Sequence, residues 1–218
     1  GPARRMRTYG AAGTRTQDEA DAGLVAAHRR LATIPPEDNI IYTDGSAINN
    51  PGPSGAGAVI EIQATNTTVE MVAALGEGTN AIGEAWAIGM ACQYIATRSL
   101  ADIHIASDSK TTVDILNMQA GSYVNLPILH AARELIMRLR KTRRVYIFWV
   151  GGHLGLAGNE AADKLADLGS ARSLHGHGMH NRIDFIKYHG KDTEVGRNSH
   201  FSINNMYTSI SKLTTSDF

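Results

Sequence analysis

The chain has 218 residues, 43% of them hydrophobic, and its 21 basic residues balance its 21 acidic ones. This suits one ordinary domain with a buried core, and the balanced charge does not single out a polyanionic partner. The one cysteine excludes an internal disulfide, and neither a run of about 18 apolar residues nor a signal-peptide pattern is present. We therefore expect no membrane contact and an intracellular location, cytoplasmic or nuclear.

The first 37 residues precede the predicted core. Residues 1–16 carry several arginines and no acid, which is typical of a disordered tail and also compatible with a basic arm for nucleic acid. Residues 18–32 (DEADAGLVAAHRRLA) predict a helix that is acidic at its start and basic at its end, as the helix dipole favours. Pro35 and Pro36 end it. We expect residues 1–37 to form a basic arm and a linker helix.

The predicted core follows in the order strand, strand, strand, helix, strand, helix, helix, strand, helix. Its strands are residues 39–44, 55–62, 69–75, 101–107 and 145–150, and its helices are residues 80–98, 109–118, 126–141 and 156–170. Short polar turns join the first three strands, whereas helices precede the later two, which suits parallel pairing. This order predicts an α/β fold with a five-stranded mixed sheet and helices on both faces.

The apolar pattern fails after residue 170. Residues 171–218 are rich in His, Ser, Thr and Asn and contain only short apolar pieces. We therefore expect a domain at residues 38–170, followed by a polar, flexible C-terminal tail.

Four carboxylates lie at the ends of predicted apolar strands or in predicted helices of the core. Asp44 and Asp108 each end a predicted strand, and ligands in α/β folds bind at the carboxyl ends of strands. Glu84 starts a helix among small and apolar neighbours, and Asp163 lies in the last predicted helix. Taken singly, each has an ordinary explanation as a turn residue, a helix cap, a dipole partner or part of a solvated face.

Taken together, these carboxylates suggest a cation site. Carboxylates gathered in one place repel one another unless a cation lies between them, and Mg²⁺ and Mn²⁺ prefer oxygen ligands. Two such ions, about 3.5–4 Å apart, serve phosphoryl transfer in many enzymes. The predicted core lacks the clustered Cys or His residues of a zinc site.

Four segments occur in order along the chain: YTDGSAINNPGPSGAGAVI, TNAIGEAWAI, IASDSK and WVGGHLGLAGNEAADKLA. Together they resemble type-1 ribonuclease H domains over roughly residues 38–170, most closely those of non-LTR (LINE-type) retrotransposon polyproteins. The resemblance implies the ribonuclease H-like fold and an endoribonuclease that cuts the RNA strand of RNA:DNA hybrids with two Mg²⁺ or Mn²⁺ ions. It further implies a role in reverse transcription beside a reverse transcriptase domain of a parent polyprotein. We expect a monomer.

The resemblance also assigns roles to individual residues. The implied catalytic metal ligands are Asp44, Glu84, Asp108 and Asp163. His153, on a Gly-rich loop, would carry a proton or help product leave. The implied contacts to the hybrid are Gly45, Ser46, Asn49, Asn80, Ser109 and Asn159.

Two departures from the family pattern weaken the expected grip on a hybrid. Ala81 and Ile82 replace an Asn and an Arg of the cellular enzymes, and residues 119–127 (QAGSYVNLP) replace a basic, Trp-containing protrusion. The basic run at residues 138–144 (RLRKTRR) could grip phosphates or simply cap a helix end. The residues predicted to pack in the core are Trp86, Cys92 and Trp149.

Two other classes of protein remain open. A catalytically silent nucleic-acid-binding or scaffold module could retain this fold, although none of the four carboxylates is missing. Relatives such as integrases, resolvases and exonucleases also cluster acids, but they do not resemble the segment of His153 and GNEAAD. A family member recruited by its host for a new role would have the same sequence features.

Overall fold

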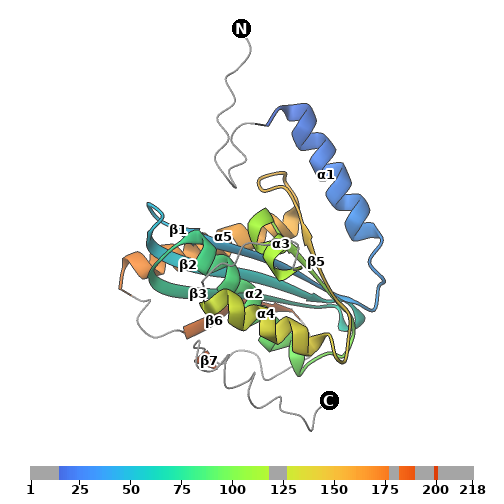
Figure 1. Cartoon of the computed structure of the whole chain (residues 1–218). Coiled ribbons are helices and arrows are strands. Elements are labelled where there is room, and N and C mark those ends of the chain that lie inside the picture. The colour runs from blue at the N-terminus through green and yellow to red at the C-terminus, as the bar shows by residue number, and fades with distance from the viewer. Residues whose placement is uncertain (1–14, 118–126, 177–181, 190–198, 201–218) are drawn as a thin grey trace.

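The computed structural model describes residues 15–117, 127–176, 182–189 and 199–200 (Figure 1). The predicted basic arm up to residue 14, residues 118–126 and most of the predicted C-terminal tail lie outside the described residues. No helix in the described part of the chain is long and apolar enough to cross a membrane.

The described strands form one sheet in the order β5-β4-β1-β2-β3-β6-β7. The antiparallel strands are β1 (Asn39–Ala47), β2 (Gly52–Ile62) and β3 (Thr67–Gly78). Strand β4 (Ile103–Ser107) pairs parallel with β1, and β5 (Val145–Trp149) pairs parallel with β4. These five strands are the mixed sheet that the sequence predicts, and its parallel part is confirmed.

The sheet continues beyond these five strands, into the region predicted as a tail. Strand β6 (Arg182–His189) pairs antiparallel with β3, and the short β7 (Ser199–His200) pairs with β6. The last helix also passes residue 170 and ends at Leu174. Its last turn is bound to the sheet, since Ser173 Oγ donates to Ser54 O at 2.5 Å and accepts from Gly76 N at 3.0 Å. The folded part of the chain therefore extends past the predicted domain end.

Helices cover both faces of the sheet, as predicted (Figure 1). In Figure 1, α2 (Asn80–Ala96), α3 (Lys110–Leu116) and α4 (Pro127–Leu139) lie in front of it, and α5 (Ala157–Leu174) lies behind. Successive strand residues point to opposite faces. Ile41 therefore joins the larger core under α2 and α4, whereas Ile40 and Tyr42 join a smaller core with Ala162 and Leu165 of α5.

The predicted linker helix, α1 (Gln17–Ala32), packs on the domain and does not stand apart from it. Thr16 begins it with a capping box, in which Thr16 Oγ1 accepts from Glu19 N and Glu19 Oε2 accepts from Thr16 N. Ala27 is buried in the smaller core, and Leu24 and Leu31 pack against that core from the same helix. The apolar side of α1 thus faces β5 and the loop that follows it.

Candidate active site

Two of the predicted site residues meet because of strand register. Thr43 of β1 pairs with Ser107, the last residue of the parallel strand β4, so the next residues, Asp44 and Asp108, lie side by side. This is the carboxyl end of β4, where the sequence predicted a site. Strand β1 continues to Ala47, so Asp44 lies within its strand and does not end it as the sequence predicted. Asp44 is 6% exposed, so its carboxylate belongs to the buried floor of the site.

A close backbone contact brings Glu84 to the same place. A Cβ atom on Gly45 would lie 2.2 Å from Glu84 N, so only glycine lets the first turn of α2 approach β1 so closely. Gly45 N donates to Asp44 Oδ1 at 2.8 Å and to Glu84 Oε1 at 3.2 Å, and Ser107 Oγ donates to Glu84 Oε2 at 3.3 Å. These donors fix the orientation of both carboxylates.

The grouping of these acids is electrostatically costly without a cation. Carboxylate oxygens of Asp44, Glu84 and Asp108 all lie within 4.8 Å of one another. Burial, followed by the charge of Glu84, raises the pKa of Asp44 far above its usual range. Burial raises the pKa of Glu84 to about 8, and the charge of Asp108 adds to this shift. An all-oxygen donor set that cannot easily hold its full negative charge fits Mg²⁺ or Mn²⁺.

Asp163 and His153 approach these acids from the other side. Asp163, on α5, interacts with Asp44 and with Asp108, and in both cases it raises the pKa of its neighbour. His153 Nδ1 lies 3.9 Å from Asp163 Oδ2, and the imidazole is 59% exposed. The structure thus brings all five predicted catalytic residues together. We call Asp44, Glu84, Asp108 and Asp163 the carboxylate cluster.

Glu160 is a neighbour that sequence reasoning missed. Ligand atoms of His153, Glu160 and Asp163 lie within 4.8 Å of one another, and Gly155 N donates to Glu160 Oε1 at 3.3 Å. Its position one helical turn before Asp163 was the available signal, because residues three apart share a helix face.

The predicted contacts to the hybrid lie around the cluster in different environments. Ser46 Oγ donates to Asp167 Oδ1 at 2.7 Å, and Ser109 is the N-cap of α3. Asn49 and Asn80 are exposed, and Asn49 has a left-handed backbone with φ of 63°. Asn159 differs from these residues because it is 1% exposed, so its side chain does not reach the surface where a hybrid would bind.

Trp149 corrects another sequence prediction. It does not pack in the core: it is 48% exposed, at the last position of β5, and its Nε1 donates to Asp108 O at 3.0 Å. The other two core predictions, Trp86 and Cys92, are confirmed, at 3% and 0% exposure.

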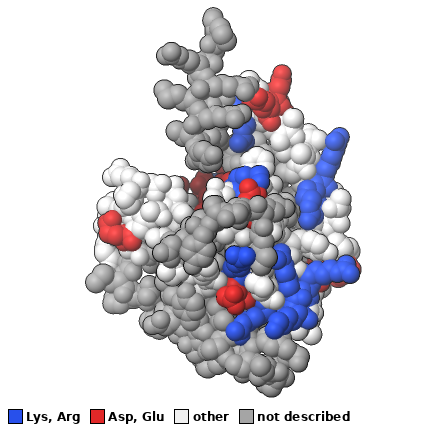
Figure 2. Space-filling model, in the orientation of Figure 1, with Lys and Arg blue, Asp and Glu red and all other residues white. Residues whose placement is uncertain are grey.

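The basic run at residues 138–144 is used partly for structure. Arg140 donates twice to Val145 O, at 3.1 and 2.8 Å, and Arg143 donates to the carbonyl oxygens of Ser99 and Ala96. These two arginines therefore tie the end of α4 to neighbouring segments. Figure 2 shows Lys and Arg side chains gathered over the part of the molecule where α4 lies in Figure 1.

The mixed sheet flanked by helices is the ribonuclease H-like fold, and in this chain it carries acids from β1, from the residue after β4 and from two helices. A model of the RNase H family matches residues 36–171, and the chain belongs to this family. Helix α1 precedes the matched residues.

Named relatives agree with this assignment. The chain is 32% identical over 155 residues to a ribonuclease H of Methylorubrum extorquens, an alignment that covers 65% of this chain and 64% of that protein. The N-terminal RNase H domain of a Mycobacterium tuberculosis protein superposes with a TM-score of 0.54 at 26% identity, over 64% of this chain and 97% of that one. LC11-RNase H1, solved in complex with an RNA/DNA hybrid, gives 0.52 at 26% identity, over 63% and 99%.

Proposed function

We propose that this protein is an endoribonuclease that cuts the RNA strand of RNA:DNA hybrids by metal-dependent phosphodiester hydrolysis. The observation that carries the proposal is the carboxylate cluster, where Asp44 of β1 lies beside the carboxyl end of β4, in a chain of the RNase H family. A scaffold that had lost catalysis would have no need of buried acids that repel one another.

The carboxylate cluster and the residues beside it have different parts in this chemistry. Two divalent cations held by Asp44, Glu84, Asp108 and Asp163 would supply Lewis-acid activation and neutralise developing charge. Gly45 N–H and the Ser107 hydroxyl hold the Asp44 and Glu84 carboxylates in orientation. His153, exposed at the rim beside Asp163, holds or passes a proton at an imidazole nitrogen as the products separate.

Recognition of the hybrid is proposed for residues on the rim of the site. The exposed Asn49 follows β1 and the exposed Asn80 starts α2. Together with Ser46, Ser109 and the backbone at Gly45, they can contact sugars and phosphates. Contacts to 2′-hydroxyls would distinguish RNA from DNA. LC11-RNase H1, of similar fold, was solved with such a hybrid.

We further propose that the hybrid cut by this protein arises in reverse transcription of a retroelement. The four motif segments, which are similar to those of LINE-type polyproteins, support this proposal. A reverse transcriptase domain would then be the partner, in the cytoplasm or nucleus, and the RNase H domain itself would act as a monomer. Light scattering on the purified protein tests the monomer directly.

An end-labelled RNA:DNA hybrid tests the proposed activity. The protein is incubated with Mg²⁺, with Mn²⁺ and with EDTA, with single-stranded and double-stranded RNA as control substrates. We expect cutting of RNA in the hybrid alone, only with metal, and none by Asp44→Asn. Asp114→Asn, a matched change on α3 outside the cluster, should cut normally. If the wild type binds the hybrid but does not cut it with either metal, the scaffold alternative holds.

A further inference from the structure

Helix α1 lies outside the residues matched by the RNase H family model, yet it touches the loop that carries His153. This loop, residues 150–156 between β5 and α5, is called the His153 loop below. It contains three glycines and has left-handed backbone at His153 (φ 54°) and Gly155 (φ 83°). Such a loop has little conformational preference of its own, so its position depends on its neighbours.

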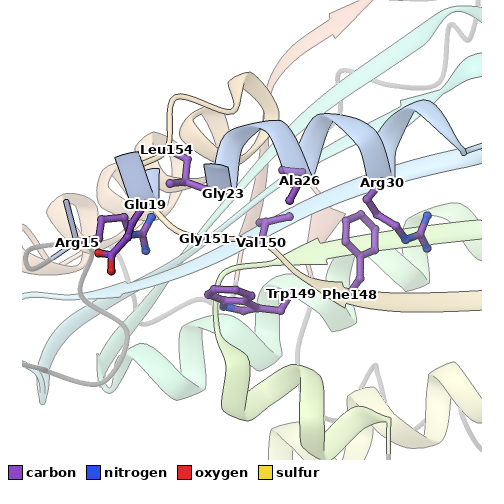
Figure 3. Close-up of a pocket in the computed structure, with 11 residues that line it drawn as sticks. Arg15, Glu19, Gly23, Ala26, Arg30, Phe148, Trp149, Val150, Gly151 and Leu154 are labelled. Carbon is purple, nitrogen blue, oxygen red and sulfur yellow. The ribbon is translucent and has the colours of Figure 1, made fainter. Parts of the chain in front are cut away.

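The outer side of the His153 loop contacts α1 and the residue before its cap. Arg15 Nη1 donates to Gly152 O at 2.9 Å across a sequence separation of 137 residues. Leu154 packs against Gly23, where a Cβ atom would lie 3.1 Å from Leu154 Cδ1. Figure 3 shows Arg15, Gly23 and Leu154 together at one end of the interface between α1 and β5.

The far end of this interface anchors α1 to the domain. The Arg30 guanidinium lies 4.4 Å from the centre of the Phe148 ring, a cation–π contact, and Ala27 is buried beside it. Between the two ends is a hollow of about 260 Å³, bordered by Trp149 and Val150 (Figure 3). The helix is thus fixed at its C-terminal half and reaches the His153 loop with its N-terminal half.

The inner side of the same loop faces the carboxylate cluster. A Cβ atom on Gly152 would lie 2.8 Å from Asp108 Oδ2, so the loop backbone rests directly on this acid. The next residue, His153, places Nδ1 3.9 Å from Asp163 Oδ2. Gly152 therefore has Arg15 on its outer side and Asp108 on its inner side.

We propose that α1 is a positioning element for the His153 loop and that Arg15 is the positioning residue. The hydrogen bond from Arg15 to Gly152 O joins a cationic donor to a loop carbonyl, and such bonds are stronger than neutral ones. It limits outward movement of the loop and thereby keeps the His153 imidazole beside Asp163. The effect on catalysis rests on the proposed function; the effect on the loop does not.

A double-mutant cycle tests the catalytic part of this proposal. We expect Arg15→Ala to lower kcat on an RNA:DNA hybrid about three- to tenfold, less than the full value of a charge-assisted hydrogen bond because Leu154 still packs on α1, with KM unchanged. In a His153→Ala background the same change should lower kcat no further, because the residue being positioned is gone. Arg15→Lys, which keeps a cationic donor, should recover part of the loss. An equal loss with and without His153 would overturn the proposal.

Hydrogen–deuterium exchange in EDTA tests the loop itself, without any requirement for activity. Arg15→Ala should speed exchange of the amides of residues 151–155 and leave the amides of β1 unchanged. Arg29→Ala, which removes an exposed cation from the same helix, is the matched control and should change neither kcat nor exchange. Unchanged exchange in Arg15→Ala would refute the positioning role. If the wild type fails to cut hybrids, the proposed function falls, and the exchange result still decides this inference.

Discussion

The two sides of the active site are held by different kinds of contact. Asp44, Glu84 and Asp108 are fixed by strand register, by burial and by the backbone contact at Gly45. The middle of the His153 loop is held by the hydrogen bond from Arg15 to Gly152 O and by the packing of Leu154. The arrangement of the acids should therefore be disturbed only when the fold is damaged. The His153 loop, in contrast, can become more mobile in a protein that remains folded.

The strongest test of this contrast is Gly45→Ala. The added Cβ atom would lie 2.2 Å from Glu84 N, so α2 must move away from β1. We expect a loss of about 3 kcal/mol in the free energy of unfolding, typical of severe overpacking, together with loss of cleavage. Chemical denaturation and the hybrid assay measure both effects. Gly155→Ala, with nothing within 4 Å of its Cβ but a φ of 83°, should cost only about 1–2 kcal/mol.

The charge of the cluster predicts how stability depends on pH in EDTA. Between pH 4.5, the usual pKa of a Glu side chain, and pH 8, folded Glu84 keeps a proton that the unfolded chain releases. The folded state then binds more protons, so stability should fall as pH rises through this range.

Thermal unfolding followed across this pH range measures the effect. Mg²⁺ or Mn²⁺ at a hundred times its Kd should restore about 2.7 kcal/mol at pH 8. Glu84→Gln should make the pH dependence shallower, with a remaining slope from Asp44, whose pKa is also raised, and Glu134→Gln, which changes an exposed acid on α4, should leave it unaltered. A profile that is equally steep in Glu84→Gln would contradict this account.

On the histidine side, Gly152→Ala should affect catalysis more than stability. The new methyl group would meet Asp108 Oδ2 at 2.8 Å and push the His153 loop outward. We expect kcat to fall about tenfold, while the free energy of unfolding changes by less than about 1 kcal/mol because the loop can move. Steady-state kinetics and thermal unfolding separate these effects; normal kcat would show that the position of the loop is unimportant.

The smallest expected effect concerns Trp149, which lies between the two sides. Trp149→Phe keeps an aromatic ring but removes the N–H that donates to Asp108 O at 3.0 Å. We expect a loss of about 1 kcal/mol in stability and a two- to threefold lower kcat, because the backbone of Asp108 is less firmly held. Tyr146→Phe, on the same strand and away from the cluster, should leave kcat unchanged.

The same contrast explains which features could be predicted from the sequence. Asp44 and Asp108 end apolar runs whose parallel pairing follows from the intervening helices, so their meeting could be anticipated. Glu84 and Asp163 were found by the family motifs, which lie on elements that pack tightly against the sheet. Local sequence carries this information because each motif residue lies beside the strand or helix that positions it.

Other features depend on contacts that no local pattern encodes. The exposure of Trp149 depends on where β5 ends, and the docking of α1 depends on a hydrogen bond between Arg15 and Gly152. Strand β6 pairs with β3 from a segment of weak apolar pattern. Residues 182–189 become a strand because β3, in the assembled sheet, offers its free N–H and C=O groups for pairing.

That pairing bears on how the protein should be prepared for study. Residues 36–171 match the family, so a chain trimmed to that length looks like the natural unit to purify. Trimming would remove β6 and leave the N–H and C=O groups along β3 open to a strand of another molecule. Aggregation of such a fragment would then reflect an exposed edge strand and not a defect in the active site. The whole chain is the form in which its chemistry should be measured.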